Sequence, residues 1–265
     1  MLHGYLNKIL SSENSLGSLE NEHWGVNLHL GYWDETTNPD YSPIGFFNAS
    51  NRMNEIVLLH SGIKSGDTVL DVGCGFGGTI KFLDQILNPL ELIGVNNDLK
   101  QLERATCHVL TGMRNKFNLM HACASHLPLP DNSVDVVLAV ECVFHFPGRD
   151  KFLREAYRVL KKGGKLFISD FVKKKRFNQR CSKIIRNSFF FNEIRPFHLI
   201  SHHRYSNLFD DSRLRDIQKI NITNHIKLNF DYLIRNSVDT ASLVESIKME
   251  TVFSNFDYMI FTGIK

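Results

Sequence analysis

The chain has 265 residues, enough for one large α/β domain or a core with a cap, and its 43% hydrophobic and 22% charged residues are ordinary for a soluble globular protein. Its formal net charge of +3 is too small to indicate a polyanionic partner for the whole molecule. No apolar run reaches the roughly 18 residues that span a membrane, and the first residues lack a secretory signal pattern, so we expect a cytoplasmic location and no membrane span.

Strand and helix patterns alternate from residue 66 onward, which is typical of a parallel sheet wrapped by helices. The predicted strands are residues 68–72, 91–96, 117–122, 134–141, 165–171, 214–223 and 256–264. The predicted helices are residues 77–87, 99–112 and 149–161, which end near Asn88-Pro89, Gly112 and Gly163-Gly164. The sequence therefore predicts an α/β fold with a Rossmann-like, seven-stranded, mostly parallel sheet and helices on both faces.

Two further regions accompany this core, which covers residues 61–172. Residues 1–60 form a predicted helical arm, whose segment HWGVNLHLGYW either packs onto the core or closes over a ligand as a lid. Residues 173–212 are basic and aromatic and are predicted to be a helical cap insertion, and residues 213–265 supply the last strands of the sheet. The run of Lys and Arg between residues 161 and 186 is typical of a solvated surface, with an anionic substrate as the alternative.

The five cysteines are an odd number without a C-x-x-C pair, which favours neither a disulfide framework nor a cysteine-based zinc site. His198, His202 and His203 lie close together in the sequence, but no carboxylate or cysteine pattern accompanies them. We therefore predict no metal site.

Residues 68–78 read TVLDVGCGFGG, an apolar strand with an acidic residue near its end and glycines that allow a sharp turn against a ligand. Gly73, Gly75 and Gly78 satisfy the dinucleotide pattern G-x-G-x-x-G. However, the carboxylate of Asp71 repels a pyrophosphate and attracts an ammonium group or ribose hydroxyls. This combination favours S-adenosylmethionine over NAD, and a glycine-rich turn without a ligand is the remaining alternative.

Several segments in order, HLGYWDE, VLDVGCGFGG, GVNNDLKQL and LPLPDNSVDVVLAVECVFHFPGRDKFLREAYRVLKKGGKLFISDF, resemble class I S-adenosylmethionine-dependent methyltransferases. The branch they resemble contains ubiquinone/menaquinone, tocopherol, sterol and natural-product sugar methyltransferases. The resemblance covers about residues 23–172, with weaker agreement at 205–223 and 256–265. It implies that residues 61–172 are the S-adenosylmethionine-binding core.

The resemblance also implies a set of cofactor-binding residues: Tyr32, Asp71, Gly73, Cys74, Gly75, Asn96, Asn97, Gln101, Ala124, Ser125 and Glu141. Asn96 stands where the family usually has an acidic residue bonded to the ribose, and asparagine can still donate and accept there. Cys123 stands where the family often has an Asp that accepts from the adenine amine, and cysteine is a weak acceptor. The backbone of Ala124 and the side chain of Ser125 are expected to replace that contact.

Methyl transfer to a hydroxyl requires removal of a proton by a group whose pKa lies near the working pH. His145, just beyond the fourth strand in ECVFHFP, has such a side chain, and Asp170 at the end of the fifth strand is a candidate to orient it. Similar sugar O-methyltransferases have His and Asp at these positions. We therefore predict both as catalytic, with packing of the loop by His145 as the alternative. We expect the acceptor pocket between the arm and residues 173–212, with candidate walls from Phe189, Phe190, Phe191, Phe197 and Tyr205. A plain hydrophobic core of the cap is the alternative reading of these aromatic residues.

The predicted function is thus an S-adenosylmethionine-dependent methyltransferase acting on a hydroxyl of a small natural product or secondary metabolite. An N- or C-methyltransferase of a small lipophilic substrate, an NAD-dependent oxidoreductase and a cofactor-binding subunit without activity remain open alternatives. Neither the N-P-P-[YFW] sequence of adenine-amino methylases nor the Pro-Cys pair of cytosine-carbon methylases occurs, so we expect no nucleic-acid partner. A homodimer is left open.

Overall fold

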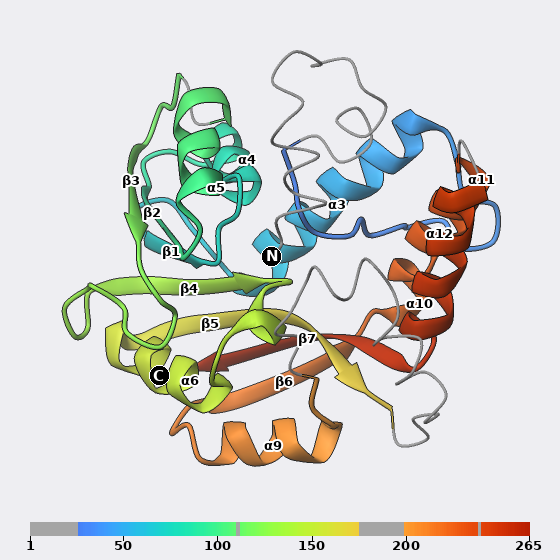
Figure 1. Cartoon of the computed structure of the whole chain (residues 1–265). Coiled ribbons are helices and arrows are strands. Elements are labelled where there is room, and N and C mark those ends of the chain that lie inside the picture. The colour runs from blue at the N-terminus through green and yellow to red at the C-terminus, as the bar shows by residue number, and fades with distance from the viewer. Residues whose placement is uncertain (1–25, 110–111, 175–198, 238–239) are drawn as a thin grey trace.

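Seven strands form one sheet in the computed structural model, which describes residues 26–109, 112–174, 199–237 and 240–265 (Figure 1). The strands are β1 (Thr68–Val72), β2 (Glu91–Asn96), β3 (Lys116–His121), β4 (Val134–Val140), β5 (Leu160–Lys173), β6 (Arg215–Asn221) and β7 (Phe256–Ile264). Their order across the sheet is β3-β2-β1-β4-β5-β7-β6, and β7 runs antiparallel to the other six described strands. The predicted α/β class and mostly parallel sheet are confirmed.

Helices cover both faces of the sheet, as predicted (Figure 1). The described helices are α3 (Pro43–Ser61), α4 (Gly78–Ile86), α5 (Leu99–Arg104), α6 (Arg149–Val159), α9 (His202–Asp210), α10 (Thr223–Ile226), α11 (Leu228–Arg235) and α12 (Thr240–Phe253). One core contains side chains of α3, α4, α5, α10 and α11 with one face of the sheet, and the other core contains those of α6 and α9 with the opposite face. Because β1 and β4 lie between these two cores, their side chains are buried on both faces.

The structure differs from the sequence-based prediction at three places. Helix α6 ends at Val159, and the fully buried Leu160 already begins β5. The two glycines predicted to end the helix, Gly163 and Gly164, therefore lie within β5. The register of β5 against β4 shifts at this place. Helix α5 is shorter than predicted and continues as a π-helical turn, Ala105–Val109. Between β6 and β7 the chain forms the three helices α10, α11 and α12, which the sequence reading did not anticipate.

Residues 26–42, the described part of the amino-terminal arm before α3, pack between α3 and the α10–α11 pair. Helix α3 begins at a Ser42 cap, whose side chain accepts from the N–H of Gly45 at 3.1 Å, and it has proline in its first turn. The arm is fixed by Asn229 of α11, which accepts from the N–H of Gly31 at 2.9 Å and donates to the Gly31 carbonyl at 2.8 Å. The described part of this segment thus packs against α3 and α11, and its predicted role as a lid stays a prediction.

Part of the predicted cap insertion lies outside the described residues, including Phe189, Phe190, Phe191 and Phe197. Tyr205, on α9, is fully buried, and its ring stacks on Phe261 at 4.3 Å between centroids. No helix in the described ranges is long and apolar enough to cross a membrane. In the same ranges, no three His, Cys, Asp or Glu side chains are grouped as metal ligands.

Candidate active site

The glycine turn begins directly at the end of β1. The N–H groups of Gly73 and Cys74 both donate to the carbonyl of Val95 on β2, at 2.7 and 3.1 Å. Gly73, Gly75 and Gly77 have φ angles of 81°, 56° and 83°, a left-handed conformation that other residues rarely adopt. The turn therefore depends on glycine at these positions, as the sequence indicated.

The arm lies against the amino-terminal turn of α4. A Cβ atom added to Gly78 would lie 2.2 Å from the Oδ1 of Asn27 and 2.7 Å from the carbonyl oxygen of Val26. Asn27 is held in place because it donates to the Oγ of Ser50 at 3.0 Å and accepts from the amide of Asn54 at 3.2 Å. Dinucleotide-binding proteins place their pyrophosphate at such a helix terminus. Two acceptor oxygens at this position disfavour a phosphate.

Asp71 is buried near the carboxyl end of β1, with 3% of its surface exposed. Burial raises the pKa of its carboxyl from 3.8 to about 7. Within the described residues, no hydrogen bond or ion pair engages this carboxyl group. Burial and the nearby Asp71 charge also raise the pKa of the Cys74 thiol, which keeps it protonated. A buried carboxyl without a counter-charge is suited to hold a cationic group, which would favour its ionised form.

Asn96 and Gln101 lie together beside the glycine turn. The amide of Asn96 donates to the Oε1 of Gln101 at 2.7 Å, and its own Oδ1 accepts from the N–H of Asn97 at 2.9 Å. Asp98 caps α5, as predicted, and accepts from the N–H of Gln101 at 3.2 Å. The Oε1 of Gln101 lies 3.9 Å from the Cβ position of Gly75. Two polar amides are thus presented at the ends of β1 and β2.

The loop after β3 adds one unpaired polar group to the same edge. The N–H of Ala122 donates to the Asn96 carbonyl at 3.0 Å, which brings this loop beside the end of β2. Ala124 is buried and the Cys123 side chain is exposed. The Oγ of Ser125 is buried and has no hydrogen-bond partner in the described part of the chain. Such an orphaned group costs about 1–3 kcal/mol, which a ligand that bonds it would offset.

Glu141 follows β4 and joins three segments of the chain. Its φ angle of 51° is uncommon for a residue other than glycine, and its N–H is held by the carbonyl and the Oγ of Ser169, at 3.0 and 3.1 Å. Its Oε2 accepts from the N–H of Leu30 at 2.9 Å and from the hydroxyl of Tyr258 at 2.7 Å. Burial raises the pKa of Glu141 to about 7, although both hydrogen bonds act in the opposite direction. Glu141 therefore fastens the arm and β7 to the end of β4.

Tyr32 lies farther along the arm. Its ring stacks on His225 of α10, with centroids 4.2 Å apart and an interplanar angle of 11°, and its N–H donates to the Ala49 carbonyl on α3 at 2.8 Å. Earlier in the arm, Leu28 lies 3.0 Å from the Cβ position of Gly75. The arm thus passes from the glycine turn, by Leu28, to α10, by Tyr32.

His145 is the last residue of a short 3-10 turn, η2 (Val143–His145), directly after Glu141 and Cys142. Its side chain is half-buried, and its ring centroid lies 4.2 Å from that of Phe144. The carboxylate of Asp170 accepts from the Arg149 guanidinium at 2.9 Å and from the Tyr205 hydroxyl at 2.7 Å. These hydrogen bonds give Asp170 a fully buried ion pair of its own, so its predicted role toward His145 stays a prediction.

Three residues of this region were not singled out from the sequence: Ser169, Tyr258 and Asn229. No motif singled out these side chains, although Ser169 lies within the family-like segment KLFISDF, and each acts through a partner distant in the chain. The sequence did contain one signal, a polar residue within an otherwise apolar strand pattern, as in ISDF and FDYMIF. A polar side chain at such a buried position must be hydrogen-bonded, so this pattern indicates a partner elsewhere in the fold.

The fold is that of a Rossmann-like methyltransferase. Its sheet is parallel except for β7, a glycine turn follows the acidic end of β1, and polar residues stand at the next two strand ends. Residues 70–168 match the family model described as "Methyltransferase domain", so this part of the chain belongs to that family. The branch is the one that the sequence resembles, that of natural-product, sterol and tocopherol methyltransferases.

Two curated relatives illustrate the likeness. The 27-O-demethylrifamycin SV methyltransferase of Amycolatopsis mediterranei is 32% identical over 167 residues, which cover 63% of this chain and 59% of that protein. Methyltransferase GfsG of Streptomyces halstedii is 37% identical over 147 residues, 55% of this chain and 51% of that protein. The chain thus spans between half and three-fifths of the length of these relatives.

The fold extends beyond the matched segment. The crystal structure of geranyl diphosphate C-methyltransferase from Streptomyces coelicolor superposes with a TM-score of 0.74 at 16% identity, over 99% of this chain and 97% of that chain. At this identity the likeness concerns the fold, and it includes the arm and the carboxyl-terminal elements.

Proposed function

We propose that the chain is an S-adenosylmethionine-dependent methyltransferase that modifies a small molecule at a hydroxyl group. The observation that carries this assignment is the Asp71 carboxyl, which is buried beside the glycine turn without a counter-charge. A ligand with an ammonium group satisfies it, whereas a pyrophosphate would meet this carboxyl and the oxygens of Asn27 and Val26. The methyltransferase family of residues 70–168 supports the same donor.

When bound, S-adenosylmethionine supplies a methyl group already activated by its sulfonium charge. The side chains present fit this group. Asp71 would hold the ammonium group, and Asn96 with Gln101 would bond the ribose hydroxyls. The orphaned Oγ of Ser125 would bond the adenine, with the backbone of Ala124 beside it. No group on this chain has to activate the donor, so its residues have to align the reactants and exclude water.

The arm supplies the cover over this site in our proposal. It is attached to the sheet by the Leu30 N–H to Glu141 bond and to α11 by the two Asn229 bonds to Gly31. Tyr32 stacks on His225 rather than standing free, so its position over the cofactor is set by α10. Closing water out in this way strengthens the electrostatic contacts of the buried carboxyls.

His145 is our candidate for the base that takes the proton of the acceptor hydroxyl. It follows β4 in the turn after Glu141, at the carboxyl edge of the sheet, and it is half-buried, which leaves part of its ring accessible. An imidazole has a pKa suited to this task near neutral pH. Asp170 would act indirectly, since its ion pair with Arg149 joins β5 to the start of α6, close after His145.

The test is to incubate the purified chain with S-adenosylmethionine and a panel of small hydroxyl acceptors, and to measure S-adenosylhomocysteine formation. His145→Ala should lower kcat by about 100-fold with unchanged affinity for S-adenosylhomocysteine. His126→Ala, an exposed histidine in the loop after β3, is the matched control and should leave kcat unchanged. Equal turnover of the two variants would remove His145 from the catalytic role, and no binding of S-adenosylhomocysteine would refute the function itself.

A further inference from the structure

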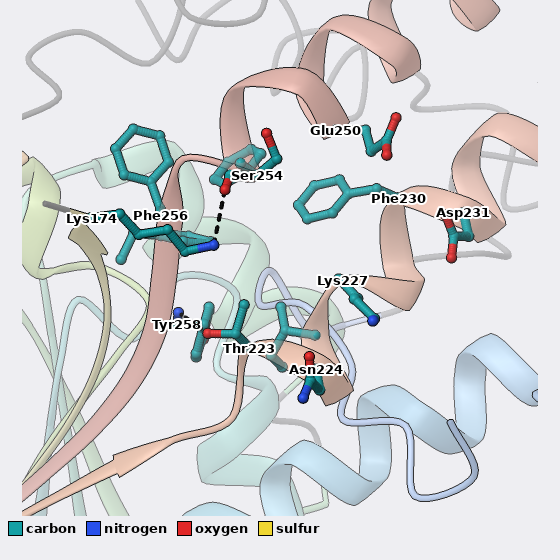
Figure 2. Close-up of a pocket in the computed structure, with 13 residues that line it drawn as sticks. Lys174, Thr223, Asn224, Lys227, Phe230, Asp231, Glu250, Ser254, Phe256 and Tyr258 are labelled. Carbon is teal, nitrogen blue, oxygen red and sulfur yellow. Dashed lines mark hydrogen bonds between the residues drawn. The ribbon is translucent and has the colours of Figure 1, made fainter. Parts of the chain in front are cut away.

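A cavity of about 250 Å³ lies where β5 and β7 meet the three helices α10, α11 and α12 (Figure 2). The described residues that line it come from the end of β5, the start of β7 and the helices between β6 and β7. Because β7 is antiparallel, its first residues lie at the carboxyl edge of the parallel strands. The cavity is therefore at the same edge of the sheet as Asp71, Asn96 and Glu141.

Two chains of contacts connect the cavity with the candidate active site. Tyr258 lines the cavity, and its hydroxyl donates to Glu141, which also holds the arm. Phe171, also in the lining, packs its ring 5.6 Å from that of Phe144, which in turn contacts the ring of His145 at 4.2 Å. Glu141 thus contacts the cavity wall directly, and His145 is separated from it by Phe144.

Aromatic rings form most of the apolar wall. The rings of Phe230 and Phe253 stack at 4.7 Å, and Phe171 contacts Phe253 at 4.6 Å and Tyr258 at 4.8 Å. An apolar cavity of about 150 Å³ holds one benzene molecule. The volume here is therefore suited to one or two rings, and flat rings would pack against aromatic side chains in offset or edge-to-face contacts.

The charges around the cavity are balanced. Two lysines, Lys174 and Lys227, and two acids, Asp231 and Glu250, belong to its lining (Figure 2). The amino group of Lys174 is already engaged, because it donates to the Ser254 carbonyl at 2.9 Å. A phosphate in this cavity would face two carboxylates, and no arginine stands among the described lining residues to neutralise it.

Two polar side chains of the lining, Thr223 and Asp231, already have hydrogen-bond partners in the protein. The Oγ of Thr223 donates to Asn221 at 2.6 Å and accepts from the N–H of Tyr258 at 2.9 Å. Asp231 accepts from the Tyr41 hydroxyl at 3.2 Å. A ligand here would gain affinity mainly by burying apolar surface rather than by replacing these bonds.

We propose that this cavity is the acceptor pocket of the methyltransferase, and that it selects an uncharged molecule presenting one or two rings over a phosphorylated one. The inference rests on the proposed function, since the pocket is connected to Glu141 through Tyr258 and to His145 through Phe171 and Phe144. It places the acceptor body between α10, α11 and α12, with its reactive group toward Tyr258 and Phe171.

The test compares two probes with the same rings. The full chain, saturated with S-adenosylhomocysteine, is titrated calorimetrically with 1-naphthol and with 1-naphthyl phosphate. We expect naphthol to bind at least about tenfold more tightly, because the phosphate would lose part of its hydration and lie near the carboxylates of Asp231 and Glu250. This comparison needs no variant. Equal or tighter binding of naphthyl phosphate, or no binding of naphthol, would overturn the inference.

Variants then locate the probe. Phe253→Ala should weaken naphthol binding by about fivefold to tenfold through the lost ring contacts, while its affinity for S-adenosylhomocysteine stays that of the wild type. Phe47→Ala on α3, where the ring is exposed outside the lining, is the control. Lys227→Ala should change naphthol affinity by less than about twofold, since no ion pair selects the ligand. Unaltered binding in Phe253→Ala, or loss of binding in Lys227→Ala, would contradict the proposal.

The outcome separates two failures. If S-adenosylhomocysteine binds and naphthol does not, the cavity is not the acceptor pocket and the proposed methyltransferase function stands. If S-adenosylhomocysteine itself does not bind, the proposed function fails, and this inference fails with it.

Discussion

Replacing Asp71 with asparagine should stabilise the ligand-free chain and weaken its binding of the cofactor. Asp71 is buried, and within the described residues no hydrogen bond or ion pair holds its carboxyl group, so removing its charge takes away no contact of the folded chain. The same charge is the proposed partner of the ammonium group of S-adenosylmethionine. The two effects therefore have opposite signs, and each is measurable on its own.

The size of the stability effect follows from the raised pKa of Asp71. A carboxyl that titrates at about 7 in the folded chain and at 3.8 when unfolded destabilises the folded state by up to about 4 kcal/mol above pH 7. Because the folded pKa is the higher one, this loss of stability develops as the pH rises from about 4 to 7. An asparagine amide still has to be desolvated, at a cost of about 1–3 kcal/mol. The net expectation for Asp71→Asn at pH 8 is a gain of about 1–3 kcal/mol.

Urea denaturation at pH 8 and pH 5.5 measures this effect, and calorimetry measures the affinity for S-adenosylhomocysteine. Asp71→Asn should be more stable than the wild type at pH 8, with a smaller advantage at pH 5.5, and should bind S-adenosylhomocysteine about 10-fold to 100-fold more weakly. Asp67→Asn is the matched control, because that buried carboxylate accepts from the Lys64 N–H at 2.9 Å, and its loss should destabilise the chain without affecting the ligand. A less stable Asp71→Asn variant at pH 8, or unchanged ligand affinity, would refute the reasoning.

Two other substitutions test the remaining contacts. Ser125→Ala removes a buried hydroxyl without a partner, so the free energy of unfolding should rise by about 1–3 kcal/mol. The affinity for S-adenosylhomocysteine should fall about threefold to tenfold, and a loss of stability in urea would contradict this expectation. Asn229→Ala removes both hydrogen bonds to Gly31 and thereby releases the arm. It should lower the free energy of unfolding by about 1–3 kcal/mol and weaken S-adenosylhomocysteine binding. Unaffected ligand binding in calorimetry would show that the arm does not cover the site.

The elements predicted correctly are those whose signals are local. An apolar run followed by glycines specifies β1 and its turn, because only glycine adopts the three left-handed φ angles at low cost. Asp98 caps α5 and thereby sets Gln101 beside Asn96, an arrangement contained within six residues. The position of the first two strand ends could therefore be inferred without tertiary information.

The contacts that were not predicted join residues far apart in the chain. Tyr258 bonds Glu141 across 117 positions, and Asn229 bonds Gly31 across 198. No local pattern encodes such pairs, because Tyr258 reaches Glu141 through the pairing of β7 with β5, and Asn229 reaches Gly31 through the packing of α11 against the arm. Asp170 was predicted from its place at the end of the fifth strand and from the resemblance, and neither indicated that its carboxylate accepts from Arg149 and Tyr205. Its role toward His145 stays a prediction.

The placement of β7 between β5 and β6 has a consequence for biosynthesis. A nascent chain that has emerged only through β6 has no neighbour for that strand, since β6 pairs with β7 alone in the described sheet. Domains begin to fold from the amino terminus during translation. The first five strands can thus assemble early, whereas the bond between Tyr258 and Glu141 and the cavity beside it form only when the closing strand leaves the ribosome.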